Sequence, residues 1–461
     1  MENIRIELHR LQSKIKGKIL LPEDNEFDSA RATWHIATDH RPALIVLAAN
    51  AKDVIETIKF AGEVGQKVTV ISTGHGPTRS ASGGIMLRLS GMDAVRIDKE
   101  ARTAYVEAGA KWSKVLEVAA KHGLAPLMGS SSDVGAVGYT LGGGLGWLAR
   151  KYGLSLDNVN YFDIVTSDAE MKRAVRDNCD DLFWALSGAG SAFGVVTSME
   201  IRLVPESFVY AGNLVYGHED AGMLFDKYLE WIEELPDEMS SALVFANFPD
   251  LPIVPEPLRG KSAAIVRGCF AGNIEDGERI VNKLREWKQP IMDMWSKIPF
   301  SMADTISKDP KEPIPVAVTN VTIDELTEKA KVALLNMTYK DEGHSPILFT
   351  EIYHMGGRIA SSDRSESVFA VRDAKYVVKI MGLVLGEGTR GFFNAAVTGL
   401  KDELKDELNR EEYPNFLEGL EKFRHPGWLY PVDILEKLGR LKARFDPDNM
   451  FENGLEIGPV P

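Results

Sequence analysis

The sequence predicts an α+β protein with two domains that meet near Pro205. Before that residue, short apolar strands alternate with helices, and seven of the eighteen residues from 129 to 146 are glycine. After it, the strand candidates and the helices become longer, and glycine clusters become rare. We therefore expect a first domain with turns that bring bare backbone close to another group, and a second domain with an extended sheet.

Residues 42–90 have the pattern of a compact α/β unit. An apolar strand over 43–50 ends at Asn50, whose side chain can cap a following helix. Apolar residues then recur at helical spacing until Gly65 ends the helix. Further strands are expected at 68–71, 85–89, 95–98, 103–109, 162–166, 194–204, 263–270, 316–323 and 346–353, and helices at 113–122, 145–151 and 220–235.

Charge and composition exclude several classes of protein. Asp and Glu (67) outnumber Lys and Arg (53), and no dense basic stripe is present, so neither nucleic acid nor an anionic membrane is an expected partner. Cys179 and Cys269 allow one disulfide at most and no multi-cysteine zinc site, so no metal is expected. The first twenty residues lack the apolar core of a signal peptide, and no stretch approaches the roughly 18 apolar residues of a spanning helix. We therefore expect a cytoplasmic protein. The sequence does not define its oligomeric state.

The loop over residues 72–84 has the composition of an anion-binding turn. Its four glycines, at positions 74, 76, 83 and 84, allow backbone N–H groups to converge on a phosphate without a basic side chain. His75 lies between two of these glycines, so its imidazole is expected to project toward whatever the loop holds. The alternative is a glycine-rich connection with an exposed histidine.

The segment 129–158 contains a second glycine cluster, too dense in glycine for a stable helix or a central strand. Two such clusters indicate a long ligand with two phosphates and a flat ring; a tightly packed loop without a ligand is the alternative. Gly188, Gly190 and Gly194 miss the G-x-G-x-x-G spacing of a nicotinamide-binding unit, and no P-loop motif exists.

The order of these motifs resembles the berberine-bridge-enzyme-like family of covalent flavoproteins, within the fold of vanillyl-alcohol oxidase and p-cresol methylhydroxylase. The resemblance extends over nearly the whole chain, although 206–400 matches only in general character. It implies a two-subdomain FAD-binding domain over 1–205 and 405–461, and a substrate domain over 206–404 with an antiparallel sheet flanked by helices. The motifs that carry it are RPALIV (41–46), TGHG (73–76), VGAVGYTLGGGLGWLARKYGLSLDN (134–158), DDLFWALSGAGSAFGVVT (180–197) and, in the tail, YPNF and RFDPDNMF.

The resemblance implies FAD bound covalently through His75 to its 8α-methyl group. Many relatives add a second link through a cysteine at the position of Ser131, so no cysteinyl link is expected here. The residues that the resemblance assigns to the cofactor are Ser72, Thr73, Gly74, His75, Gly76, Pro77, Gly129, Ser130, Ser131, Asp133, Val134, Gly135, Gly138, Tyr139, Leu141, Gly142, Gly143, Gly144, Asn158, Phe193, Gly194, Val195 and Asn453.

The resemblance also implies an FAD-dependent oxidoreductase, and it favours oxidase activity over dehydrogenase activity. Hydride would pass from an alcohol, sugar hydroxyl or amine C–H to flavin N5, and O2 or another acceptor would reoxidise the flavin, with O2 giving H2O2. A base must remove the substrate's O–H or N–H proton. Tyr413 in YPNF matches a tyrosine with this role in several relatives, although it is equally a candidate for a buried structural tyrosine. Tyr353 and Tyr376, near the matching sheet strands, are the other candidates.

Two further alternatives remain open from the sequence. The same fold serves dehydrogenases that use an acceptor other than oxygen, and Val195 is one of the residues on which that difference depends. A flavin-binding protein with a degenerate substrate site is the second alternative, because the base has no assigned position.

Overall fold

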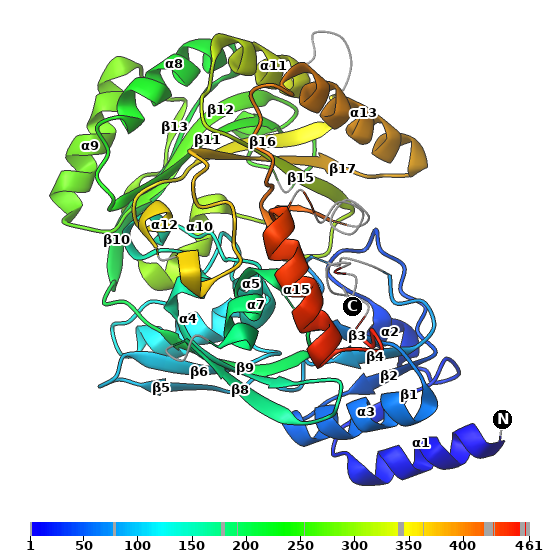
Figure 1. The fold of residues 1–461 in the computed structure, drawn as a ribbon. Helices are drawn as coiled ribbons and strands as arrows, with labels where there is room; N and C mark the ends of the chain where they lie inside the picture. Colours follow the sequence, from blue (N-terminus) through cyan, green and yellow to red (C-terminus); the bar gives the residue numbers. More distant parts are fainter. Residues whose placement is uncertain are drawn as a thin grey trace.

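The computed structural model describes residues 2–76, 80–176, 180–190, 192–252, 254–339, 345–362, 364–418, 427, 429–451 and 457. Two smaller sheets lie at one end of the molecule and one large sheet lies at the other (Figure 1). This is the α+β architecture that the sequence predicts. Pro77, Cys179 and Asn453 lie outside the described residues.

The first small sheet forms around the predicted α/β unit, with strand order β1-β2-β4-β3. Asn50 caps helix α3 by accepting a hydrogen bond from the Asp53 N–H, and Gly65 ends the helix in the left-handed region (φ 63°), as the sequence predicts. Its strands are β1 (Lys18–Leu20), β2 (Leu44–Leu47), β3 (Val68–Ile71) and β4 (Ile85–Arg88), and its helices are α1 (Glu2–Lys14), α2 (Phe27–Arg31) and α3 (Ala51–Val64).

The second small sheet has the order β5-β6-β9-β7-β8, with all neighbours antiparallel. Its strands are β5 (Val95–Asp98), β6 (Thr103–Glu107), β7 (Val159–Val165), β8 (Met171–Val175) and β9 (Val195–Arg202). The helices of this part are α4 (Trp112–Ala120), α5 (Ala136–Leu141), α6 (Ala149–Tyr152) and α7 (Asp181–Ala189), with the 3-10 turn η1 (Ser155–Asn158).

One expectation for the glycine-rich segment is wrong. The glycine content argued against any helix between residues 129 and 146, yet α5 lies within it. This helix has six residues, and only Gly138 among them is glycine. Four of its residues are buried, so tertiary packing offsets the conformational cost of a short helix with one glycine.

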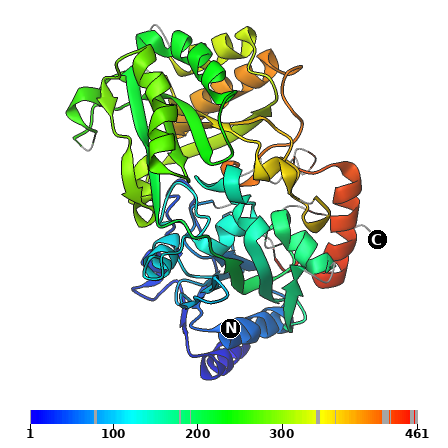
Figure 2. The same ribbon diagram turned by 90° about the vertical axis from the view of Figure 1, so that its left-hand side faces the viewer.

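The large sheet has eight strands, in the order β13-β10-β12-β11-β16-β17-β15, with β14 paired to β10. Four long helices cover its outer face (Figures 1 and 2). The strands are β10 (Phe208–Gly217), β11 (Met239–Asn247), β12 (Ser262–Phe270), β13 (Met292–Asp293), β14 (Ser296–Pro299), β15 (Val316–Ile323), β16 (Ile347–His354) and β17 (Tyr376–Leu383), and the helices are α8 (Ala221–Ile232), α9 (Ile274–Trp287), α11 (Glu328–Thr338) and α13 (Glu387–Glu403).

The two faces of the large sheet have different surroundings. Side chains alternate between faces along a strand. Tyr353 of β16 and Val377 of β17 pack in the same core as the glycine-rich segment, whereas Ile352 and Val378 pack beneath the helices. We call the side of Tyr353 and Val377 the inner face. Alternate residues of β16 and β17 therefore point toward the first two sheets.

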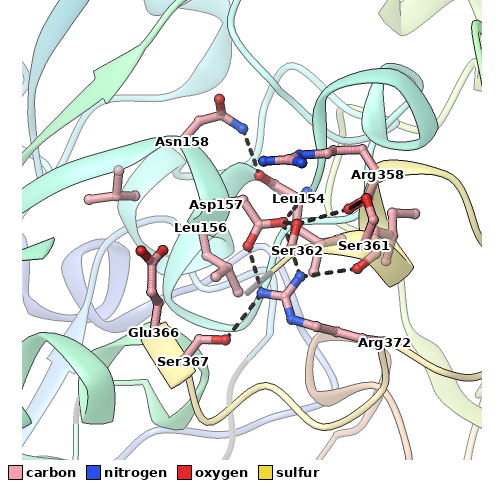
Figure 3. Close-up of polar contacts among 12 residues, drawn as sticks. Leu154, Leu156, Asp157, Asn158, Arg358, Ser361, Ser362, Glu366, Ser367 and Arg372 are labelled. Atoms are coloured by element: carbon pink, nitrogen blue, oxygen red, sulfur yellow. Dashed lines mark hydrogen bonds and ion pairs between the residues drawn. The ribbon is translucent and has the colours of Figure 1, made fainter. Parts of the chain in front are cut away.

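The chain returns to the first two sheets after β16 and again at its end. The return after β16 contains α12 (Arg358–Ser361) and is held by an ion pair in which both carboxylate oxygens of Asp157 contact the Arg372 guanidinium, at 2.6 and 3.0 Å (Figure 3). Helix α15 (Val432–Phe445) lies beside α7. Among the residues that the structure describes, every helix is too short or too polar to span a membrane. The remaining short elements are α10 (Asp304–Ser307), η3 (His218–Asp220), η4 (Glu256–Leu258), η5 (Phe300–Met302), η6 (Arg364–Glu366) and η7 (Pro414–Phe416).

Candidate active site

Some positions of the glycine-rich segment (residues 129–146) require glycine because neighbouring atoms leave no room for a Cβ atom. A Cβ atom on Gly142 would lie 1.9 Å from the Asn415 Oδ1 atom, and one on Gly146 would lie 1.8 Å from the Met128 carbonyl oxygen. The alternative of a tightly packed loop therefore accounts for these positions. It does not account for every glycine of the two predicted loops.

Gly76 and Gly138 are exposed, and a Cβ atom on either would meet nothing within 4 Å. Packing within the chain therefore does not require glycine at these two positions. Bare backbone on an open surface beside two loops is the arrangement expected where a ligand approaches the main chain.

His75 is held in a defined orientation beside these glycines. Its ring stacks on Trp34, with centroids 4.6 Å apart, and its Nδ1 lies 2.9 Å from the Thr73 hydroxyl. The other nitrogen, Nε2, is buried and has no hydrogen-bond partner. Burial lowers the pKa of His75 to about 4, against a smaller opposite effect of the Asp133 carboxylate. The imidazole is therefore neutral at neutral pH.

The two predicted loops meet at the hydroxyl of Thr73, which accepts a hydrogen bond of 3.3 Å from the Gly135 N–H. The neighbouring Ser72 hydroxyl is buried without a partner. Buried polar atoms normally have a hydrogen-bond partner. The Ser72 hydroxyl and His75 Nε2 therefore mark a place where a polar or reactive group is expected.

A loop from the second domain closes over residues 130–133. Ser130 and Ser132 donate hydrogen bonds to Asp309 and Asp304 respectively, the second at 2.7 Å. The Lys311 carbonyl accepts a hydrogen bond of 3.1 Å from the Trp34 indole. Ser131, where many relatives have a cysteine, is buried and accepts a hydrogen bond from the Asp133 N–H at 3.3 Å.

Four polar residues gather on the inner face of the large sheet. The Glu351 carboxylate accepts hydrogen bonds from the Arg267 guanidinium at 3.0 Å and from the Tyr353 hydroxyl at 2.8 Å. The Lys379 ammonium lies 3.6 Å from the second carboxylate oxygen, because Glu351 and Lys379 are directly opposite each other on β16 and β17. We call these four residues the inner-face cluster.

Tyr353 connects the inner-face cluster to the glycine-rich segment. Its ring stacks on Phe416 and lies 6.3 Å from the ring of Trp147, a residue just after the last glycine of that segment. Burial and the negative charge of Glu351 raise the pKa of Tyr353 well above its ordinary value. Tyr353 therefore keeps its proton and donates it toward Glu351.

The structure separates the three tyrosines that the sequence proposes as bases. Tyr413 is fully buried, and its oxygen accepts hydrogen bonds from the N–H groups of Gly144 and Leu145, at 3.1 and 2.9 Å. Burial raises its pKa to about 12. Tyr376 packs beneath the helices, on the face of the sheet opposite Tyr353. Tyr353 is the one of the three that belongs to the inner-face cluster.

Several other predicted cofactor residues lie in the interior of the first domain. The Asn158 amide donates to the carbonyl oxygens of Tyr152 and Leu154, at 3.0 and 3.1 Å (Figure 3 shows the second). A Cβ atom on Gly194 would lie 2.5 Å from the Val165 carbonyl. The predicted residues with buried side chains there are Leu141, Asn158, Phe193 and Val195. These residues therefore pack in the core of the first domain, beneath the two loops.

Sequence reasoning missed several residues of this site. Trp34 and Asp309 carry no motif of their own, and only the fold brings them to the two loops, whereas Phe416 lies in the YPNF motif but has no role assigned from the sequence. Glu351 had a signal, because a charged residue in the middle of the apolar run ILFTEIY is buried only if it is paired. Within the described part of the chain, no cluster of three His, Cys, Asp or Glu side chains is arranged to hold a metal ion.

Comparisons with known proteins agree with this geometry. Residues 42–174 match the family model of the FAD binding domain. Over 460 residues the chain is 26% identical to an FAD-linked oxidoreductase of Dictyostelium discoideum, covering 97% of this chain and 95% of that protein. It is 32% identical over 286 residues to the (R)-6-hydroxynicotine oxidase of Paenarthrobacter nicotinovorans, 60% of each chain. The structure of Physcomitrella patens BBE-like 1 matches with a TM-score of 0.83 at 18% identity, over 98% of this chain and 99% of that one.

The fold and the matched region define an enzyme that binds FAD, an FAD-linked oxidoreductase. Over nearly its whole length the chain has the fold of Physcomitrella patens BBE-like 1, and it is therefore similar to berberine-bridge-enzyme-like proteins in fold. Both the fold and the FAD cofactor are those that the sequence motifs predict.

The residues present fit this cofactor. Gly76 and Gly138 offer bare backbone where a diphosphate can approach, and the Ser72 hydroxyl is free to donate a hydrogen bond to it. The neutral imidazole of His75 has a free nitrogen in the same place. Backbone donors and one unpartnered hydroxyl suit a dinucleotide without requiring any lysine or arginine.

Proposed function

We propose that this chain is an oxidase for a small molecule with an oxidisable C–H bond next to an O–H or N–H group. Bound FAD supplies a two-electron acceptor that takes hydride at N5 and passes the electrons on to dioxygen, giving hydrogen peroxide. The observation that carries the proposal is the hydrogen bond between Tyr353 and Glu351. Both residues lie on the inner face of the large sheet, the face that is turned toward the glycine-rich loops. The similarity to (R)-6-hydroxynicotine oxidase supports an oxidase over other activities.

The Tyr353–Glu351 pair serves as the base in this proposal. The substrate's O–H or N–H proton moves to the Tyr353 oxygen while the Tyr353 proton moves to Glu351. Arg267 and Lys379 place two positive charges beside the Glu351 carboxylate and hold it against the Tyr353 hydroxyl. Trp147 and Phe416 flank the Tyr353 ring and keep water from the transferred proton.

We further propose that His75 binds the cofactor covalently, with no second link. A neutral imidazole is a competent nucleophile, and the lowered pKa of His75 keeps it neutral at neutral pH. Ser131 lacks the thiol that a cysteinyl link needs. Residues 1–205 and 405–461 would form the domain that holds the cofactor, and residues 206–404 the domain that selects the substrate.

Acid precipitation of the purified protein tests the covalent link. We expect a yellow pellet from the wild-type protein and a colourless pellet from His75→Ala, because only a covalent bond survives unfolding. Trp34→Phe is the matched control, since it keeps an aromatic ring against His75, and its pellet should stay yellow. A colourless wild-type pellet would remove the link and leave FAD as a dissociable cofactor.

Anaerobic mixing with a panel of alcohols, sugars and amines tests the activity. At least one compound should bleach the flavin absorbance, and admitted air should restore the colour and yield hydrogen peroxide. Bleaching without rapid recovery in air would identify a dehydrogenase that uses another acceptor. An absence of bleaching across the panel would contradict the proposed oxidase activity.

A further inference from the structure

We propose that the substrate carries a carboxylate, which binds at the inner-face cluster beside Arg267 and Lys379. The oxidised alcohol or amine is then also an acid. The proposal rests on the proposed function and adds the chemical class of the substrate. Two observations carry it: the inner face has a surplus positive charge, and a buried N–H group of Arg267 has no acceptor among the described residues.

The strand register shows which residues share the inner face with Tyr353 and Glu351. Each of the two belongs to a row of directly opposed residues that crosses six strands, from β10 on one side to β15 on the other. The charged residues of these rows are Arg267, Glu351 and Lys379, two positive and one negative, so the formal net charge is +1. The row of Tyr353 contains Asn213, Arg267, Ala242, Val377 and Thr322, and the row of Glu351 contains Val215, Ile265, Val244, Lys379 and Asn320.

The loop packed against this face does not cancel the surplus charge. Its Asp309 carboxylate contributes to the raised pKa of Tyr353, so it lies near the inner face. Asp309 accepts a hydrogen bond from Ser130 of the first domain. It belongs to residues 304–311, in which two lysines balance two aspartates, so this loop adds no net charge. The positive charge of the inner face therefore remains where a substrate would meet Tyr353.

Arg267 and Lys379 also have hydrogen-bond donors to offer. The Arg267 Nη1 atom donates to Glu351, whereas its Nε is buried and has no hydrogen-bond partner among the described residues, although buried polar atoms normally have one. The Lys379 ammonium lies 3.6 Å from Glu351, beyond hydrogen-bond distance, so this contact leaves its N–H groups available. A carboxylate matches these donors, because it carries one negative charge and two oxygens that only accept hydrogen bonds.

A bound carboxylate also suits the proposed proton transfer. Once the proton reaches Glu351, that group loses its negative charge, and Arg267 and Lys379 are left beside a neutral acid. Unpaired charges in a buried place are costly. A carboxylate on the substrate keeps its charge through the step and leaves one negative charge beside the two cations. A neutral sugar or alcohol supplies no such charge.

Titration of the flavin-loaded protein with benzoate and with benzamide tests the proposal, because the two probes share a ring and differ in charge. At neutral pH, benzoate should perturb the flavin absorbance and bind at least about tenfold more tightly than benzamide. It should also raise the KM of a compound that bleaches the flavin without changing kcat. Equal affinities, no benzoate binding, or binding that does not compete would each overturn the proposal. Bleaching by a compound of the panel would still support the proposed function, so the two can fail separately.

Two variants test whether these cations hold the carboxylate. Arg267→Met and Lys379→Met should each weaken benzoate binding by about tenfold or more and leave benzamide binding unchanged. If loss of Arg267 prevents folding, Lys379→Met decides, because the Lys379 side chain is partly exposed. Arg285→Met is the matched control, since Arg285 pairs with Asp293 at 2.7 Å from helix α9 on the outer face, and it should bind benzoate as the wild-type protein does. Unchanged benzoate affinity in the folded variants of Arg267 and Lys379 would overturn the proposal.

Discussion

The glycine-rich segment and the inner face of the large sheet pack in the same core, and they expose different chemical groups. The segment over residues 129–146 presents main chain, and its glycines either pack closely or leave an open surface. The inner-face cluster presents charged and phenolic side chains from three strands of a sheet. One side can hold a cofactor without ionisable groups, and the other can move a proton.

This difference implies a division of roles between the two regions. Backbone N–H groups and open glycines can bind a ligand without any particular side chain, because every residue except proline carries a backbone N–H. Side chains on alternate positions of a sheet can change without altering the fold. The identity of the substrate should therefore depend on the sheet, and the binding of FAD on the loops.

The largest expected effect comes from removing the proton acceptors of the sheet. Tyr353→Phe and Glu351→Gln should each slow anaerobic flavin bleaching by about 10²–10⁴-fold with any compound that bleaches the wild-type protein. Flavin content should stay normal, because neither residue belongs to the FAD-binding loops. Stopped-flow absorbance gives both quantities.

The matched control for this effect is Tyr376→Phe, because Tyr376 lies on the opposite face of the same sheet. Its bleaching rate should equal that of the wild-type protein. Equal slowing of Tyr353→Phe and Tyr376→Phe would show that the two faces do not differ in the way the structure indicates.

The second effect concerns the ion pair between Asp157, which follows the glycine-rich segment, and Arg372 in the second domain. Arg372→Met removes a fully buried guanidinium and leaves the partly buried Asp157 carboxylate without its charged partner, and should lower the free energy of unfolding by about 3–5 kcal/mol. Arg173→Met, in a pair whose arginine is half exposed, should change it by less than about 1 kcal/mol. Urea unfolding of both variants checks this, and equal losses would contradict it.

The third prediction concerns Gly138→Ala, which should change the FAD content of the protein without lowering its stability. Gly138→Ala adds a methyl group to the open surface of α5, where nothing in the chain lies within 4 Å. Alanine favours a helix over glycine by about 0.5–1 kcal/mol, so the variant produced without flavin should be no less stable than the wild-type protein produced in the same way. The variant produced with flavin should contain less FAD. Gly399→Ala, in α13, should give the same gain with unchanged FAD content. A Gly138→Ala protein with a full complement of FAD would place the cofactor elsewhere.

The last effect depends on pH and concerns the junction of the two regions, where the Arg150 guanidinium lies 3.0 Å from His354 Nε2. Burial and this positive charge lower the pKa of His354 to about 3, compared with about 6.5 for an unfolded histidine. The unfolded chain therefore binds a proton before the folded chain does. Stability is complete above pH 6.5 and falls as the pH drops toward 3.

For His354 alone this loss is about 1.4 kcal/mol per pH unit, because one proton is taken up on unfolding. His354→Gln should make the fall in stability between pH 6.5 and 5 shallower by that amount, as measured by urea unfolding at each pH. An unchanged slope would mean that His354 is protonated in the folded protein.

The same contrast explains how much of the molecule could be predicted from the sequence. The two glycine-rich loops can be recognised in the sequence because their signal is local: glycine density and a histidine between glycines lie within short stretches of chain. The inner-face cluster combines Arg267, Glu351 and Lys379, which are far apart in the sequence and meet only through the strand register. Tyr353 and Tyr376 were indistinguishable in the sequence, because their faces depend on how β16 and β17 pair.

The helix α5 could not be predicted for a related reason. Local propensity argues against a helix in a glycine-rich segment, and burial against the rest of the domain overrides it. Trp34 is a further case, since only the loop that follows α2 brings it onto His75. Each of these features depends on contacts between distant parts of the chain.

A crystal structure of the purified yellow protein tests most directly whether the two regions share one flavin. The account predicts density for FAD along Gly76 and Gly138, continuous with the His75 side chain, and with the substrate side of the flavin ring open toward Tyr353. Flavin density away from His75, or a ring turned from the inner-face cluster, would contradict it.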